Sequence, residues 1–368
     1  MVSDKQRLAQ GATNLLLNCA ELVAGEKVLV VREPAGLGYY DDEVAEEVAV
    51  TARELGIIVK TLEVPFNPIV KDPGTHLSGL MADADCTIFF ARLGDQLRFR
   101  ESSSRTTSVM SYALDAGMLA SRFGRTSYAD LIRVKTLVDK ALSEASSIRV
   151  TCPAGTNLHG KGQQGEGQSV ETTVRRFPLS VFSPVLAESF SGVVAQRGFL
   201  CNTGSQSYDP PACEILDVLN VCIESGKIVR FEGRPDDVER AERHYTFVSE
   251  LFGLDKYNVH SWHAGIHPGC AYRKPANYFF DRWSNGAFGN PRVLHFHTCG
   301  QHAPGEISLN VIDPTILLDG VTVWDSGVLR LENIKGGKDL LDASNELRTL
   351  FSEPENQCGL GPSGHLEF

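Results

Sequence analysis

The stretch KVLVVREPAGLGYYDDE, residues 27–43, joins a short apolar run to a glycine-containing loop and an acidic segment. Its apolar part, residues 27–31, is typical of a strand that is buried on both faces. The aspartate pair at its end can cap a helix, which is expected to reach residue 55 before Gly56. A second strand is expected over residues 57–63. A strand, a helix and a strand in this order predict two parallel neighbours in one sheet.

The same alternation continues on both sides of this stretch. Apolar residues at helical spacing predict a helix over residues 8–23, and Gly25 is expected to end it. Further along, the pattern predicts a strand over residues 85–91, a helix over 128–145 and a strand over 148–152. Residues 1–150 are therefore expected to form an α/β, Rossmann-like domain with a mainly parallel sheet.

The loop after the first expected strand does not match a dinucleotide-binding fingerprint. Gly36 and Gly38 form a GxG pair, but Asp41 stands where the third glycine is needed for close packing of helix and strand. The sequence predicts a strand-to-helix loop here, and no dinucleotide cofactor.

The residue composition and the expected secondary structure change after residue 150. Glycine and proline are frequent between residues 153 and 167, and short strands are expected afterwards. A meander is expected over residues 214–233, and a helix over 236–254. Residues 315–324 predict a hairpin because Asp319 and Gly320 separate two alternating runs. We expect a mixed α+β metal-binding domain over residues 151–352 and a loose tail over 353–368.

Composition limits the classes of partner. The chain of 368 residues has 46 Asp and Glu against 35 Lys and Arg, a formal net charge of −11. This balance argues against nucleic acid or an anionic membrane surface as a partner, since both require clustered basic residues. The apolar runs are shorter than the roughly 20 residues of a membrane helix. Nine cysteines without a CxxC pair predict free thiols and a cytoplasmic location.

Histidine is the residue that points to chemistry. Six of the ten histidines lie between residues 260 and 302, in NVHSWHAGIHPG and VLHFHTCGQHAPGE. His295 and His297 are two residues apart, so in a strand both imidazoles share one face at a spacing of about 6.5–7 Å that one metal ion can bridge. The alternative is a polar strand face with surface histidines.

Several other side chains are candidates for the same site. His302 and Glu306 follow in a loop that can fold back over this face, and an imidazole set with a carboxylate suits non-haem iron, zinc or manganese. His260, His263 and His267 are either ligands or hydrogen-bonded structural histidines. Glu188 is set in an apolar stretch, which indicates burial beside a metal or a surface turn. The remaining candidates are Cys270 and Cys299, as thiols or buried fillers, and Arg273 and Lys274, as binders of a substrate carboxylate or solvated charges.

Four segments together resemble the thermophilic aminopeptidase family, aminopeptidases T and S, and its relative 2,5-dihydroxypyridine 5,6-dioxygenase. These segments are NLLLNCAELVAGEKVLVV, ADADCTIFFA, IRVTCPAGTNL and TILLDGVTVWDSG, with VTCPAGTNL the most specific. The similarity spans most of residues 8–332. It implies an α/β domain followed by a mixed domain that holds the metal.

The resemblance also implies a set of metal ligands. Glu188, His263 and His297 correspond to three of the four places where the family carries them, and Ser261 beside His260 is an alternative match to His263. The fourth place is an HxD motif shortly before the hairpin, but the sequence there is GEISLNVID, without a histidine. Glu306, or else Asp313, is expected to supply the carboxylate, with His295 and His302 supplying nitrogen.

This imidazole-rich set favours a single transition metal over a two-metal peptidase centre. Together with this ligand set, the resemblance implies a cytoplasmic, homo-oligomeric catabolic enzyme, an Fe(II) ring-cleaving dioxygenase or related lyase acting on a small hydroxylated (hetero)aromatic acid. Its ligands would be His263, His297 and Glu306, with His295 or His302 as a further ligand or acid/base and His260, His267 and Arg273 near the substrate. One alternative is a zinc- or manganese-dependent aminopeptidase or amidohydrolase with Glu188 as ligand or base. Another is a protein that binds metal without catalysis.

Overall fold

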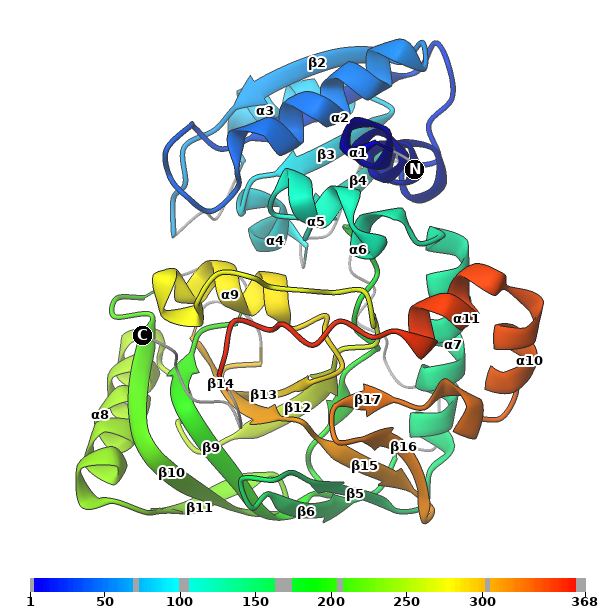
Figure 1. The fold of residues 1–368 in the computed structure, drawn as a ribbon. Helices are drawn as coiled ribbons and strands as arrows, with labels where there is room; N and C mark the ends of the chain where they lie inside the picture. Colours follow the sequence, from blue (N-terminus) through cyan, green and yellow to red (C-terminus); the bar gives the residue numbers. More distant parts are fainter. Residues whose placement is uncertain are drawn as a thin grey trace. The chain divides into compact units, whose positions relative to one another are not determined.

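The computed structural model describes residues 3–68, 73–98, 106–162, 174–203, 208–301 and 305–361. The chain divides into two compact units (Figure 1). The first unit runs to Ile132 and also includes a short segment that ends at Ser180. The second unit contains Arg133 to Gly167 and everything from Val181 onward.

The first unit is built on a sheet whose described strands are all parallel. Their order is β2-β1-β3-β4-β7, so the chain goes from β1 to β2 on one side and then crosses to β3 on the other. This confirms the expected α/β unit with a parallel sheet. The strands are β1 (Lys27–Arg32), β2 (Ile58–Glu63), β3 (Cys86–Phe90), β4 (Thr107–Ser111) and β7 (Arg175–Phe177).

Helices follow the strands as the alternating pattern predicts. Because crossovers between parallel strands are right-handed, the reversal at β1 places α2 and α3 on opposite faces of the sheet. The helices are α1 (Asp4–Thr13), η1 (Asn14–Cys19), α2 (Asp42–Glu54), α3 (Gly74–Ala82), α4 (Leu93–Leu97), α5 (Ala116–Ala120) and α6 (Arg122–Arg125).

The first helix ends earlier than the sequence predicts. It closes with the π-helical turn η1 at Cys19, whereas the pattern indicated a helix as far as residue 23. Glu21 then adopts a left-handed backbone with φ of 59°. Leu22 is still buried after the helix has ended, which explains why its apolar character suggested a longer helix.

The expected strand at 148–152 belongs to the second unit, which corrects the expected boundary at residue 150. The helix α7 (Tyr128–Glu144) begins in the first unit and ends in the second. It leads into β5 (Ile148–Thr151), which pairs antiparallel with two strands of the second unit. Periodicity identifies such a strand, but the choice of its partners depends on contacts distant in sequence.

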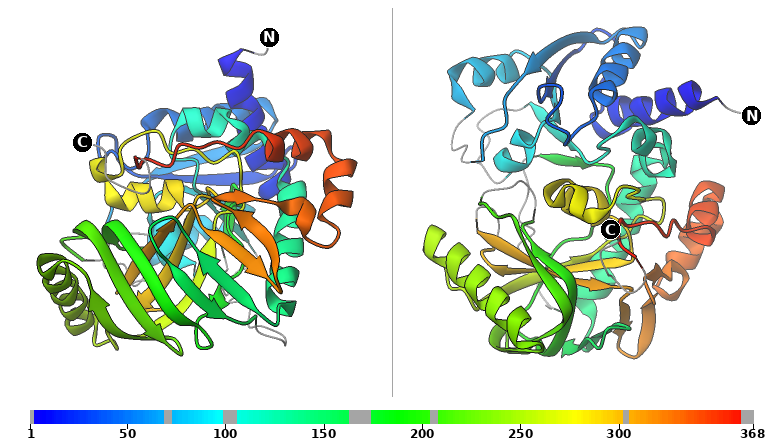
Figure 2. Two further views of the ribbon diagram at one scale, coloured as in Figure 1. Left: turned by 60° about the horizontal axis from the view of Figure 1, so that its bottom comes forward. Right: turned by 60° about the vertical axis from the view of Figure 1, so that its left-hand side comes forward.

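The described strands of the second unit form one 12-stranded sheet. Its main path is β17-β16-β15-β5-β6-β9-β14-β13-β12-β8, and β10 and β11 extend it beside β9 (Figure 2). Strands not yet given are β6 (Asn157–Gly160), β8 (Val185–Leu186), β9 (Ser191–Cys201), β10 (Ala212–Glu224), β11 (Lys227–Glu232), β12 (Val259–Ala264), β13 (Val293–Cys299), β14 (Glu306–Ile312), β15 (Thr315–Leu318), β16 (Val321–Asp325) and β17 (Val328–Leu329).

Two local predictions in this unit are confirmed. The expected meander is the hairpin β10–β11, and the expected hairpin at 315–324 is β15–β16, with left-handed backbones at Asp319 and Gly320. The helix α8 (Pro235–Phe252) packs against β10 and ends at Gly253. The other helices are η2 (Ala276–Tyr278), α9 (Phe280–Ala287), η3 (Leu331–Asn333), α10 (Gly337–Ala343) and α11 (Asn345–Ser352).

The described part of the C-terminal tail is bound to the second unit, so the expectation of a loose arm is wrong for residues 353–361. Cys358 is fully buried, and its carbonyl accepts a hydrogen bond of 2.6 Å from Trp283. The backbone of Tyr272 donates to the carbonyl of Gln357. Proline and glycine in this segment suit an extended chain, but its buried side chain and backbone bonds keep it in place.

All nine cysteines are free thiols, as the missing CxxC pairs predict. Among the helices formed by described residues, none combines the length and the apolar character that crossing a membrane requires.

Candidate metal centre

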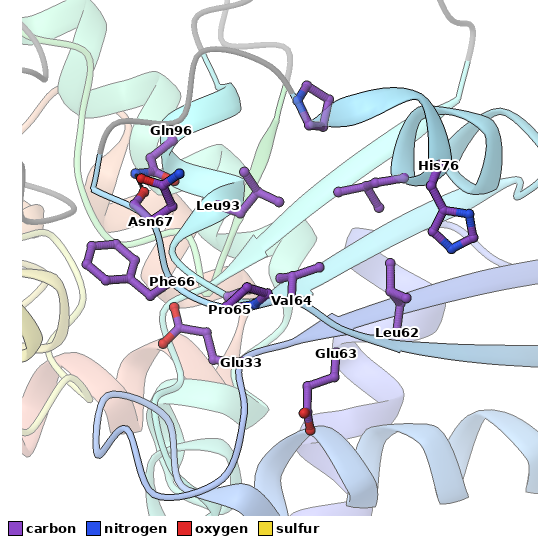
Figure 3. A pocket seen from close by; sticks show the side chains of 13 residues that line it. Glu33, Leu62, Glu63, Val64, Pro65, Phe66, Asn67, His76, Leu93 and Gln96 are labelled. Carbon is purple, nitrogen blue, oxygen red and sulfur yellow. Dashed lines mark hydrogen bonds between the residues drawn. The ribbon is translucent and has the colours of Figure 1, made fainter.

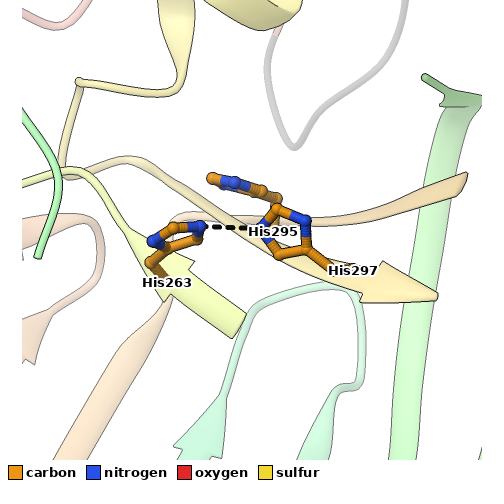
Figure 4. Close-up of side chains that lie close together, drawn as sticks. All are labelled: His263, His295 and His297. Carbon is orange, nitrogen blue, oxygen red and sulfur yellow. Dashed lines mark hydrogen bonds between the residues drawn. The ribbon is translucent and has the colours of Figure 1, made fainter. Parts of the chain in front are cut away.

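Three histidines gather on one face of the antiparallel sheet, where β12 and β13 pair. His263 lies directly opposite His295, and Ser261 lies opposite His297. Facing residues share a face of the sheet, and so do residues two apart in one strand. His263, His295 and His297 therefore project from the same face (Figure 4).

The three imidazoles are close together and buried. Their potential ligand nitrogens all lie within 4.8 Å of one another. The ring centres of His263 and His295 are 4.6 Å apart, those of His263 and His297 4.8 Å, and those of His295 and His297 5.1 Å. Each side chain belongs to a residue that is at most 7% exposed. Desolvation strengthens any electrostatic interaction at this point.

The hydrogen bonds behind two of the rings determine their protonation. Nδ1 of His263 lies 3.0 Å from the carbonyl oxygen of Phe182, and Nδ1 of His297 contacts a carboxylate oxygen of Glu306. Both partners accept, so both Nδ1 atoms carry the proton, and a neutral imidazole then has a lone pair at Nε2. The Nε2 atoms of His263 and His297 face each other at 2.7 Å. Two lone pairs at this distance require a positive charge, either a metal ion or an extra proton.

Glu306 is held from its other side as well. Its second carboxylate oxygen accepts a hydrogen bond from the hydroxyl of Thr203, and its backbone carbonyl accepts one of 2.7 Å from the hydroxyl of Tyr208. Burial raises the pKa of Tyr208 well above its ordinary value, so the phenol stays a donor. These contacts orient Glu306 and, through it, the ring of His297.

His295 is positioned by an aromatic contact. Its ring stacks on Phe288 with 3.9 Å between the ring centres and 21° between the planes. Phe288 follows α9, which itself precedes β13, so His295 and the ring that supports it come from neighbouring parts of the chain.

The residues present fit a divalent transition metal. Imidazole nitrogens lie about 2.0–2.1 Å from such an ion, which places two of them about 3.0–3.4 Å apart. The separation of 2.7 Å between His263 and His297 is a few tenths of an ångström shorter, a gap that small ring movements close. With three protein nitrogens, the ion would keep positions open for other ligands.

The structure changes the role expected of Glu306. It is not placed as a ligand, because one carboxylate oxygen bonds Nδ1 of His297 and the other bonds Thr203. The alternative carboxylate, Asp313, forms an ion pair of 2.6 Å with Arg292 and is not placed as a ligand either. Among the described residues, the group that could hold a metal ion therefore consists of three imidazoles and does not include the expected carboxylate.

Other described candidates for the site have partners of their own outside this group. Glu188 is exposed in a turn, which fits the surface alternative and not a buried ligand or base. His260 contacts Asn258, and His267 accepts a hydrogen bond from the backbone of Gly269. Arg273 is 62% exposed and pairs with Glu355 of the tail. His302 lies outside the described residues.

The two cysteines near the histidine segments do not have the character of reactive thiols. Burial raises the pKa of Cys299 to about 12 and raises that of Cys270 further. A thiol with so high a pKa stays protonated at neutral pH, and the protonated form is a poor nucleophile. Both cysteines therefore match the alternative in which they are small buried residues that fill space in the core.

Sequence reasoning missed three contributors to the cluster. Thr203 is 103 residues from Glu306, and Phe182 supplies a backbone carbonyl 81 residues from His263. Neither position carries a local signal. Phe288 lies a few residues before β13, which carries His295. From the sequence alone, a phenylalanine at this position cannot be told from an ordinary core residue.

Comparisons with known proteins support the fold. One similar structure is 2,5-dihydroxypyridine dioxygenase from Pseudomonas putida KT2440, with a TM-score of 0.59 and 18% sequence identity over 89% of this chain and 98% of that one. Another is wild-type AmpT from Thermus thermophilus, with a TM-score of 0.49 and 11% identity over 89% of this chain and 100% of that one. No family model and no curated protein matches the chain. The first structure shows that the fold of this chain, with a parallel sheet and a large antiparallel sheet, is one found in a known protein.

Proposed function

We propose that the chain is a mononuclear metal-dependent enzyme, an Fe(II) ring-cleaving dioxygenase whose ligands are His263, His295 and His297. The observation that supports this most directly is the pair of Nε2 atoms of His263 and His297 at 2.7 Å, each with its Nδ1 proton held by an acceptor. A cation between these atoms satisfies both lone pairs. The third imidazole, within 4.8 Å, completes one face of a coordination shell.

The nature of the ligands favours one transition metal. Imidazole suits iron, zinc, copper and nickel, whereas manganese and magnesium prefer oxygen ligands. Within the described part of the chain, the three histidines are the one group of this kind. A two-metal peptidase centre normally uses bridging carboxylates, and the nearest one, Glu306, is bonded to His297 and Thr203.

The charge of the site supports an anionic, chelating substrate. Three neutral imidazoles leave a divalent ion with its full positive charge, which an ionised ring hydroxyl and a neighbouring carboxylate or second hydroxyl can balance. Phe288, stacked on His295, adds an aromatic surface beside the cluster. The similar solved structure is named as a 2,5-dihydroxypyridine dioxygenase. A small hydroxylated (hetero)aromatic acid is therefore our proposed substrate class.

The chain's own residues have defined tasks in this proposal. An Fe(II) ion, when bound, would supply the electrons and the open positions that dioxygen chemistry requires. Phe182 and Glu306 keep the Nδ1 protons of His263 and His297 in place and so direct both Nε2 lone pairs inward. Burial of the three rings keeps bulk water away from the reacting groups.

A zinc hydrolase is the second candidate. Three histidines with one open position are also a catalytic zinc set, in which the ion activates a water molecule. The same imidazoles support this reading, and metal identity separates it from the first.

The test starts with elemental analysis of the full chain purified without an affinity tag, alongside His297→Ala. The proposal predicts about one iron per chain, lost in the variant, and oxygen uptake with a panel of hydroxypyridines. One zinc per chain with amide release from aminoacyl anilides and no oxygen uptake would establish the second candidate instead. Two zinc or manganese ions per chain would contradict both.

A further inference from the structure

The first unit contains a cavity at the place where parallel sheets usually bind ligands. In the strand order β2-β1-β3, the chain reverses direction at β1, and crevices outside the carboxyl ends of the strands at such a point are common ligand sites. Glu33 follows β1, Phe66 and Asn67 follow β2, and Leu93 follows β3. All four line one cavity of about 300 Å³ (Figure 3).

The long walls of this cavity are apolar. Leu62 and Val64 project from one face of β2 and its extension toward α3, which contributes Leu77 (Figure 3). Glu63, between them, points to the other face because side chains alternate along a strand. Leu93 adds a further aliphatic wall. A cavity with this much apolar lining suits a small, largely apolar ring.

One end of the cavity carries a buried carboxylate whose geometry is rigid. The side chain of Glu33 is 4% exposed. One of its oxygens accepts from the backbone N–H of Arg92 at 2.7 Å and from Nε at 2.9 Å, and the other accepts from Nη2 at 2.8 Å. The guanidinium lies 3.5 Å from the centre of the Phe66 ring and 4.6 Å from that of Tyr39. The guanidinium of Arg92 thus contacts two aromatic rings.

Glu33 retains the ability to accept another hydrogen bond. An ionised carboxylate has about four acceptor positions, and the three bonds from Arg92 use three of them. Gln96 also lines this cavity, and its amide nitrogen donates to the backbone carbonyl of Asn67 at 2.8 Å. Its amide oxygen adds a second acceptor. The polar end of the cavity therefore offers acceptors to a ligand.

We propose that this cavity is a small-molecule site for a planar heteroaromatic ring that carries an amino group. The ring lies between the aliphatic walls, and the amino group donates to Glu33 and to the amide oxygen of Gln96. The site is independent of the proposed metal chemistry, because its residues all belong to the first unit.

Three related purines test the proposal by calorimetric titration of the full, metal-loaded chain. Adenine has the amino group, purine lacks it, and hypoxanthine has a carbonyl in its place. We expect adenine to bind at least tenfold more tightly than purine, and hypoxanthine to bind most weakly because its oxygen would face the carboxylate. Equal affinity for adenine and hypoxanthine, or no saturable binding of adenine, would overturn the proposal.

Variants locate the binding without disturbing the buried ion pair. Val64→Trp fills the slot and should weaken adenine binding at least tenfold. Ile58→Trp, at the exposed start of the same strand, is the matched control and should bind like wild type. His297→Ala should lose its metal and keep adenine binding, which separates this inference from the proposed function. Adenine binding that disappears in His297→Ala and persists in Val64→Trp would place the ligand elsewhere and refute the site.

Discussion

Two buried glutamates, one in each unit, are held in different ways. Glu33 of the first unit accepts three hydrogen bonds from Arg92, which carries a permanent charge. Glu306 of the second unit bonds Nδ1 of His297 and the hydroxyl of Thr203. In the first pair, the positive charge of Arg92 balances the negative charge of Glu33. In the second pair, the carboxylate makes the imidazole of His297 a better electron donor at Nε2. The pair therefore influences how strongly Nε2 binds a cation.

A buried glutamate can therefore either form a closed ion pair or act on a further group through the residue that it contacts. An arginine partner compensates the charge of Glu33 and leaves one acceptor position of its carboxylate open to a ligand. A histidine partner transmits the effect of Glu306 to the centre of the cluster. Substitutions at the two pairs, and at another buried histidine of the second unit, test this comparison.

The largest effect is expected from Arg92→Met. The substitution leaves the carboxylate of Glu33 buried without its cation, and it should lower the free energy of unfolding by about 3–5 kcal/mol in urea titrations. Arg53→Met is the control, because Arg53 lies 4.0 Å from Glu46 in an exposed pair that should contribute about 0–1 kcal/mol. Equal effects of the two substitutions would contradict the role assigned to the buried pair.

Acid should destabilise the second unit through His244. Burial lowers the pKa of this histidine from 6.5 to about 4, so it stays neutral in the folded chain. Between pH 6.5 and 4 the unfolded chain binds a proton that the folded chain does not, and stability is lost as the pH falls, by up to about 3 kcal/mol. His244→Phe should flatten this pH dependence in urea titrations.

The matched control for His244 is His76→Phe. His76 is exposed on α3, so His76→Phe makes the same replacement outside the core. A His244→Phe variant that loses stability in acid as steeply as wild type would refute the assignment.

A smaller effect is expected from Glu306→Gln. An amide keeps the size of the side chain but removes its charge, so the ring of His297 becomes a weaker donor. Metal affinity, measured by competition with a chelator, should fall about 10–100-fold. Glu188→Gln makes the same change at an exposed turn and should leave the affinity unchanged. Loss of metal in Glu188→Gln and retention in Glu306→Gln would reverse the assignment.

Thr203→Val should have the smallest effect. It removes one hydrogen bond to Glu306 while His297 remains bonded to the same carboxylate. A lost hydrogen bond of this kind costs about 1 kcal/mol, which corresponds to about fivefold weaker metal binding in the same competition assay. A drop as large as that of Glu306→Gln would mean that Thr203 does more than orient the carboxylate.

Local patterns predicted much of the fold. The run at residues 27–31, the helix that ends before Gly56 and the turn at Asp319 and Gly320 all have the expected structure. Each depends on chain neighbours a few residues apart. Where long-range pairing decides, the prediction was wrong, as for β5, which joins the antiparallel sheet. The tail near Cys358 was also misjudged, because its buried contacts lie far away in sequence.

The candidate site follows the same division. A spacing of two residues was enough to place His295 and His297 on one side of a strand, since side chains alternate along an extended backbone. The resemblance had already pointed to His263, but its place opposite His295, the contact of Glu306 with Nδ1 of His297 and the contact with Thr203 depend on how β12, β13 and β14 pair and where the chain around residue 203 lies. Chain geometry sets the direction of each side chain locally, whereas the atoms it meets depend on which distant strand folds beside it.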